Sequence, residues 1–186
     1  MTCIVGFIDD DKNIWMGADS AGTNGWLQQR IRADEKVFIK DDMIFGFTSS
    51  FRMGQLLRYA LTIPDHSTKK DTMTYMCTDF IEAVRTLLKD KGFGKQKENV
   101  DIGGTFLVGY RGGLYEIESD YQVACPTERY EACGCGDDLA MASIYTTLTM
   151  SEERDPQKII KRALKSAYKF SAGVKPPFKI LKLEKQ

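Results

Sequence analysis

The order of the predicted secondary-structure elements is the feature that most limits the fold of this 186-residue chain. Runs of strands alternate with pairs of helices, whereas a parallel, doubly wound sheet would need single helices between successive strands. Two antiparallel sheets packed together, with a helix pair on each outer side, would bury all the apolar surfaces of these elements. We therefore predict an α+β fold, a four-layer αββα sandwich. Because no segment is rich enough in Pro, Gly and Ser to act as a linker, we expect a single domain over residues 1–186.

Strands are predicted where short apolar runs are bounded by polar turns. These runs are 2–8, 14–18, 36–39, 43–47, 105–110, 113–118, 121–125, 130–133 and 178–183. A loop is predicted over residues 21–25. Helices are predicted where apolar residues recur every three or four positions behind a favourable starting residue. They begin near Ser49-Ser50, after Asp71, after Gly136 and at Asp155-Pro156.

The charges of the chain balance, with 26 basic and 26 acidic residues. A net charge of zero gives no reason to expect nucleic acid or an anionic membrane as a partner. No apolar run approaches the roughly 20 residues of a membrane span. The N-terminus also lacks the basic and apolar regions of a signal peptide. We therefore expect a cytoplasmic protein with no nucleic-acid partner and no membrane partner.

Five cysteines and one histidine offer little metal or relay chemistry. The cysteine spacing fits neither a zinc site nor a disulfide framework, so reduced thiols are the favoured interpretation and we expect neither a metal nor a cofactor. The single histidine, His66, lies in a turn-like polar stretch without a recognisable partner motif, so we do not expect it to be catalytic. The cysteines are Cys3, Cys77, Cys125, Cys133 and Cys135.

A threonine follows the initiator methionine directly. Removal of Met1 would expose Thr2 with both a hydroxyl and a free α-amine, so that one residue could act as nucleophile and base. Threonine is small enough for an aminopeptidase to remove the methionine before it. The alternative is that Thr2 is an ordinary strand residue behind a retained methionine. Cys3 could also be considered as a nucleophile, but alternation along the strand directs it to the opposite face, and we expect it in the core.

Five short motifs, in this order along the chain, resemble those of the proteasome β-subunit and HslV group of N-terminal nucleophile hydrolases. They are Thr2-Cys3-Ile4-Val5-Gly6, Gly17-Ala18-Asp19, Lys36-Val37-Phe38, Ile44-Phe45-Gly46-Phe47 and Gly134-Cys135-Gly136. The resemblance extends over most of the chain and implies the αββα fold predicted above. It also implies hydrolysis of peptide bonds by an N-terminal threonine.

The resemblance assigns a role to each site residue. Thr2 Oγ would attack the scissile carbonyl, and the α-amine would accept the hydroxyl proton. A buried Lys36 would stabilise the alkoxide, and Asp19 would keep that lysine charged and oriented. Backbone N–H groups near Ser49 would hold the oxyanion, and Cys135 would occupy the position of a family serine near the Thr2 amine. Alternatively, the Asp19–Lys36 pair could be purely structural, or Lys36 could be a solvated hairpin residue.

The chain departs from the family pattern in three places, and the first two leave a second function open. Ser49 stands where the oxyanion loop usually has glycine, and its Cβ restricts the backbone. Cys135 replaces the serine of Gly-Ser-Gly and is a weaker hydrogen-bonding group. Residues 168–173 lack the carboxylate that proteasome β-subunits carry before a late Ser-Gly pair; HslV lacks it too, so this departure favours HslV more than inactivity. The alternative function is therefore a catalytically inactive ring or scaffold subunit.

The resemblance also implies partners. Family members assemble into rings whose active sites face an inner chamber, so we expect a homo-oligomer that takes peptides or unfolded proteins. This chain contains no phosphate-binding loop of the Walker type, so an ATPase unfoldase, if one feeds the ring, would be a separate protein. A third interpretation is a small-molecule amidase that acts as a monomer or dimer.

Overall fold

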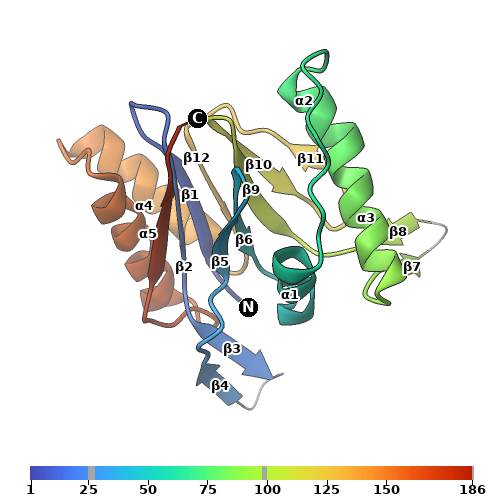
Figure 1. Ribbon diagram of the computed structural model, residues 1–186. Coiled ribbons are helices and arrows are strands. Elements are labelled where there is room, and N and C mark those ends of the chain that lie inside the picture. The colour runs from blue at the N-terminus through green and yellow to red at the C-terminus, as the bar shows by residue number, and fades with distance from the viewer. Residues whose placement is uncertain (25–27, 98–99, 186) are drawn as a thin grey trace.

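Four layers in the order helices, sheet, sheet, helices make up the computed structural model, which describes residues 1–24, 28–97 and 100–185 (Figure 1). All strand pairs within each sheet are antiparallel. The predicted αββα sandwich is therefore confirmed. The first sheet has the strand order β12 (Tyr130–Cys133), β1 (Ile4–Ile8), β2 (Ile14–Ala18) and β13 (Lys179–Leu183).

The second sheet combines strands from both halves of the chain. Its order is β11 (Val123–Ala124), β10 (Gly113–Ile117), β9 (Phe106–Tyr110), β6 (Met43–Phe47) and β5 (Val37–Lys40). Two small hairpins stand apart from both sheets; they are β3 (Ala21–Asn24) with β4 (Gln28–Ile31), and β7 (Lys95–Lys97) with β8 (Val100–Ile102). The loop predicted over 21–25 is wrong for 21–24, because these residues pair with β4; Gly25 lies outside the described residues.

The helices begin where the sequence predicts them. Asp71 and Asp155 cap their helices by accepting hydrogen bonds from backbone N–H groups in the first turn, and Ser50 does the same for α1. The helix predicted after Asp71 differs in one respect, since its middle is a π-helical segment. The helices are α1 (Phe51–Tyr59), α2 (Thr72–Tyr75) with the π segment η1 (Met76–Phe80) and α3 (Ile81–Asp90), then α4 (Asp137–Met150) and α5 (Pro156–Phe170). Within the described residues, no helix combines the length and the apolar character that a bilayer span requires.

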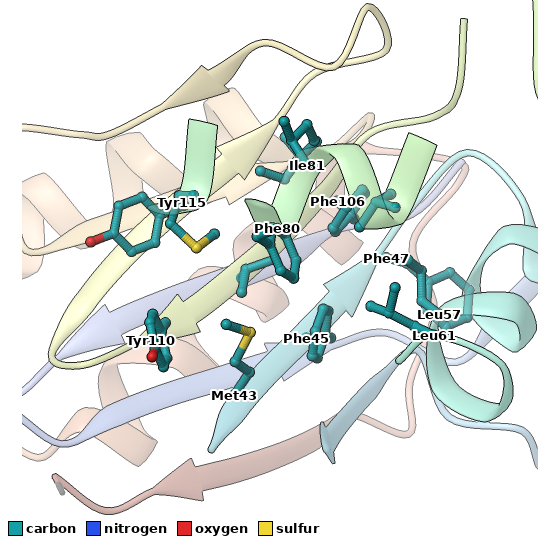
Figure 2. Close-up of a cluster of buried hydrophobic side chains, with 14 of the residues drawn as sticks. Met43, Phe45, Phe47, Leu57, Leu61, Phe80, Ile81, Phe106, Tyr110 and Tyr115 are labelled. Carbon is teal, nitrogen blue, oxygen red and sulfur yellow. The ribbon is translucent and has the colours of Figure 1, made fainter. Parts of the chain in front are cut away.

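Three apolar layers lie between the four layers of secondary structure. The cluster between the second sheet and α1–α3 is rich in aromatic side chains, including Phe45, Phe80 and Tyr110 (Figure 2). A second cluster joins the first sheet to α4 and α5, and a third lies between the two sheets. Every residue of β1, β6 and β9 is buried, because both faces of these strands are covered.

Candidate active site

A buried ion pair lies at one end of the two sheets. Asp19 follows β2 directly and Lys36 precedes β5 directly, so the ends of strands from different sheets bring these side chains together. Lys36 Nζ lies 2.8 Å from Asp19 Oδ1, and the two side chains are 1% and 0% exposed. Lys36 is therefore not a solvated hairpin residue. Removing either partner would leave the other charge buried without compensation.

Four donors surround the Asp19 carboxylate. Oδ1 accepts from Lys36 Nζ and from the backbone N–H of Cys3 at 3.1 Å. Oδ2 accepts from the backbone N–H of Ala21 at 2.8 Å and of Lys175 at 3.2 Å. Hydrogen bonds to the ionised form stabilise a buried carboxylate. Asp19 therefore links the beginning of the chain, the start of β3, Lys36 and the segment before β13 in one fixed arrangement.

Thr2 lies against this ion pair. Its Oγ1 accepts a hydrogen bond from Lys36 Nζ at 2.9 Å, and its hydroxyl donates to the Met1 carbonyl. Thr2 is only 4% exposed, and Figure 1 shows the N-terminus between the ends of the two sheets, close to α1. One ammonium group thus contacts both the threonine hydroxyl and the Asp19 carboxylate, which is the arrangement that an activated hydroxyl nucleophile needs.

Burial and charge act on Lys36 in opposite directions. Burial lowers the pKa of Lys36, because removal from water penalises the ammonium form, and the Asp19 carboxylate opposes that shift. The pKa remains below its ordinary value, so the proton on Nζ is held less tightly than on a lysine in water. Such a group can stabilise a developing alkoxide and exchange a proton with its neighbour more readily than an exposed lysine can.

Cys135 completes the surroundings of Thr2. Its Sγ accepts the backbone N–H of Thr2 at 3.3 Å and lies 3.3 Å from Ser171 Oγ. The preceding residue, Gly134, has a φ of +105°, and a Cβ there would lie 2.4 Å from the carbonyl oxygen of Thr2. Only glycine allows this approach, so Gly134 fixes how closely the Cys135 segment passes Thr2.

The loop between β6 and α1 forms a wall of the site. Ser49 has a φ of +60°, a left-handed conformation, although it carries a Cβ. The backbone N–H groups of Thr48 and Ser50 donate to Thr105 O and Thr48 O, whereas that of Ser49 has no acceptor among the described residues. A small cavity of about 60 Å³ lies here, lined by Met1, Thr2, Ala21, Thr23, Lys36, Phe47, Thr48, Ser49, Ser50 and Phe51.

Cys3 and His66, which are not expected to be catalytic, both have contacts typical of structural residues. Cys3 is fully buried in the cluster beneath α4 and α5, and burial together with the Asp19 charge raises the pKa of its thiol. His66 uses both ring nitrogens, with Nδ1 at 3.0 Å from Tyr110 Oη and Nε2 at 2.9 Å from the Lys70 carbonyl. All five cysteines are free.

All five residues predicted for the site lie around the start of the chain, but three further contributors were missed. Ser171 contacts Cys135, Gly134 provides the close approach, and the N–H of Lys175 binds Asp19. Gly134 belongs to the motif Gly134-Cys135-Gly136, but the sequence alone does not show its positive φ. The other two lie more than 30 residues from their partners, and the sequence contains no pattern that pairs them.

Comparisons with known proteins agree with this architecture. No family model matches the sequence, and no curated protein matches it. Among solved structures, Thiobacillus denitrificans BPH in complex with epoxomicin is 16% identical, with a TM-score of 0.82 and full coverage of both chains. HslV from Trypanosoma brucei is 18% identical with a TM-score of 0.70, covering 98% of this chain and 99% of HslV. The Anbu (Gly-1) mutant from Hyphomicrobium sp. strain MC1 is 14% identical with a TM-score of 0.68, covering 100% of this chain and 84% of Anbu. The chain therefore has the proteasome-like fold of the N-terminal nucleophile hydrolases, shared with BPH, HslV and Anbu.

Proposed function

We propose that this protein is a threonine-type peptidase in which Thr2 becomes the N-terminal nucleophile after removal of Met1. The observation that carries the proposal is the position of Lys36 Nζ, 2.9 Å from Thr2 Oγ1 and 2.8 Å from Asp19 Oδ1 in a buried site. From this position the ammonium group can stabilise negative charge that develops on the threonine oxygen while the carboxylate holds it in place.

The proposed reaction begins when the free amine of Thr2 accepts the hydroxyl proton, directly or through a water. Oγ1 then attacks the substrate carbonyl, while Lys36 stabilises the negative charge on the attacking oxygen. The N–H of Ser49 is a donor for the oxyanion, an interaction worth about 2.7–4 kcal/mol. The amine proton passes to the leaving nitrogen, and an ester between Thr2 and the acyl group remains. Water then hydrolyses that ester and regenerates the hydroxyl.

Cys135 has a supporting role in this proposal. Its sulfur lies 3.3 Å from the nitrogen that becomes the α-amine when Met1 is removed. A thiol is a weaker hydrogen-bonding group than a hydroxyl. It can still orient one N–H bond of the amine, so that the nitrogen lone pair is directed to the Thr2 hydroxyl.

We extend the proposal to the assembly. The likeness to HslV and BPH supports a homo-oligomeric ring that hydrolyses peptides or unfolded proteins in the cytoplasm, and a separate ATPase unfoldase is a candidate partner. The solved complex of BPH with epoxomicin also suggests a probe, since an epoxyketone reacts with both the hydroxyl and the amine of an N-terminal threonine.

Hydrolysis of a fluorogenic peptide by matched variants tests the proposal. We expect activity in the protein whose Met1 has been removed, none in Thr2→Ala, and a reduced but measurable rate in Thr2→Ser, which keeps a hydroxyl and an amine. Mass spectrometry of each variant establishes the state of the N-terminus. Absence of hydrolysis from a protein with a free Thr2, across a peptide library, would favour the inactive ring or scaffold subunit instead.

A further inference from the structure

A second, larger hollow lies far along the chain from Thr2, between the exposed side of α5 and strand β13. It has a volume of about 880 Å³ and shares no lining residue with the cavity beside Thr2. Its lining is strongly basic, although the whole chain has no net charge. A single carboxylate, Asp155, lines it together with five lysines, Lys158, Lys161, Lys165, Lys169 and Lys179.

Three of these lysines have no ion-pair partner among the described residues. Two of the five are ion-paired, one with Glu153 and Asp155 and one with Glu35. Among the described residues, no carboxylate lies within ion-pair distance of Lys161, Lys165 or Lys169, and all three are exposed. A row of unpaired cations beside a groove attracts an anionic partner and rejects a basic one.

Part of the groove lining is apolar, and β13, which also contributes to the lining, has an open sheet edge. The apolar part of the lining includes Tyr168, Phe178 and Ile180. Strand β13 ends the first sheet, and in the part of the chain that the structure describes no strand pairs with its other edge (Figure 1). An unpaired edge presents backbone N–H and C=O groups to which an extended peptide can add.

The spacing of the free lysines matches that of alternate side chains on such a peptide. Lys161, Lys165 and Lys169 lie four residues apart along α5, which is about 6 Å per step at the rise of an α-helix. Residues that share one face of an extended strand recur at intervals of about 6.7 Å. Three successive carboxylates on one side of an added strand can therefore meet three successive lysines.

We propose that this groove binds an extended peptide with an acidic residue at every second position, which adds to the open edge of β13 as a further strand. The acidic side chains contact the lysine row of α5, and the peptide backbone pairs with β13. This inference does not depend on the peptidase activity. A single-stranded nucleic acid also carries negative charge, but it has no backbone N–H groups with which to pair with a strand edge.

Fluorescence anisotropy with a labelled heptapeptide, Glu-Val-Glu-Val-Glu-Val-Glu, tests the proposal. The Thr2→Ala protein is used, so that cleavage of the probe does not interfere. We expect saturable binding that weakens as salt is raised, because charge pairs at a surface are screened. The matched peptide with lysine in place of glutamate should not bind, and a peptide of the same composition with its glutamates in one block should bind at least about tenfold more weakly.

Charge-reversal variants locate the site. Lys161→Glu, Lys165→Glu and Lys169→Glu together should weaken binding of the alternating peptide at least about tenfold. A control of equal charge change, made at three exposed lysines outside the groove, should leave binding within about twofold; it carries Lys12→Glu, Lys69→Glu and Lys91→Glu. Equal weakening by both sets would overturn the proposal, because the attraction would then be non-specific.

N-methylated peptides test the strand pairing on the protein with unchanged lysines. Methylation of every second peptide nitrogen blocks one edge of an extended strand, and the two possible registers block opposite edges. One register should abolish binding and the other should preserve it. Equal binding of both registers would overturn the added-strand geometry. If oligo-dT binds more tightly than the peptide and its binding depends on the three lysines, the proposal is overturned and the groove is assigned to nucleic acid. If the peptide does not bind and the triple lysine variant loses oligomeric mass, the groove is assigned instead to a second copy of the chain.

Discussion

At the scale of single residues, the site depends on Lys36, which is almost completely buried and makes its two closest polar contacts with Thr2 and Asp19. Burying a charge is costly unless it is paired and hydrogen-bonded. Asp19 supplies the opposite charge, and its own remaining oxygen positions are occupied by backbone donors. The arrangement holds an ammonium group against a hydroxyl with little freedom to move, as a preorganised catalytic group requires.

Replacement of that ammonium should remove activity. We expect Lys36→Met to lower peptide hydrolysis at least about 100-fold, because the alkoxide would lose its cation. We also expect a loss of about 3–5 kcal/mol in the free energy of unfolding, since Asp19 would be left as an unpaired buried charge. Lys40→Met, at a partly buried lysine of the same hairpin, is the control. Hydrolysis at the wild-type rate in folded Lys36→Met would show that the ion pair is purely structural.

Ser49 allows a second prediction at this scale. Its backbone already has the positive φ that glycine would adopt, so Ser49→Gly should change the rate of hydrolysis by less than about threefold, or about 0.7 kcal/mol. Ser49→Val should lower it strongly, because a β-branched residue rarely adopts this conformation. The two variants are compared by kcat/KM on one fluorogenic peptide. A large loss in Ser49→Gly would mean that the serine side chain, which accepts from Thr105 N at 3.0 Å, is itself needed.

At the scale of elements, two half-buried glutamates lie on neighbouring strands of the two sheets, Glu116 on β10 and Glu131 on β12. Burial raises the pKa of Glu116 to about 7, and the charges of Glu118 and Glu131 act in the same direction. Burial also raises the pKa of Glu131. A group whose pKa is higher in the folded state stabilises the fold below the unfolded pKa and loses that contribution as pH rises.

The stability of the wild-type protein should therefore fall as pH rises from 4.5 to about 7, the interval between the ordinary and the raised pKa of Glu116. The loss is about 1–2 kcal/mol, because the side chain is only half-buried and solvent screens part of the effect. Glu116→Gln should remove this pH dependence and be the more stable protein at pH 7. Urea unfolding at several pH values across this interval measures the free energy of unfolding of the wild-type protein and of Glu116→Gln. Parallel profiles for wild type and Glu116→Gln would contradict the assignment, and exposed Glu152→Gln should match wild type.

Much of this architecture could be predicted from the sequence, because apolar runs and helix caps act locally. The hairpin of β1 and β2 and the start of each helix follow from such patterns. The π segment Met76–Phe80 and the pairing of β3 with β4 could not be predicted, since tertiary packing decides them. The prediction that Thr2, Asp19 and Lys36 form one site was based on a family resemblance. Local pattern alone does not say which strand ends meet across two sheets.

At the scale of the whole molecule, the helix pair α4–α5 carries large apolar side chains in contact with solvent. Tyr145 is 61% exposed, Met150 80% and Phe170 72%. These side chains belong to one outer layer of the fold, and exposed apolar side chains are the kind of surface on which another protein can pack. This feature supports the proposed homo-oligomer.

Light scattering should give a mass several times the 21.0 kDa of one chain. Met150→Glu with Phe170→Glu should lower that mass, because burying a new charge in an interface is unfavourable. Tyr59→Glu, at an exposed aromatic residue on α1, is the control and should leave the mass unchanged. If the wild-type protein is a monomer, it cannot form a ring with an inner chamber, and the small-molecule amidase is favoured instead.

The most direct test of the central claim is the mass of the N-terminal peptide after incubation with a peptide epoxyketone. We predict that the protein lacking Met1 gains one equivalent of the inhibitor on Thr2, because this warhead bonds to a hydroxyl and an amine on the same residue. Labelling should be lost in Thr2→Ala and strongly slowed in Lys36→Met. An N-terminal threonine that is free and remains unmodified under conditions that label an active threonine peptidase would contradict the account.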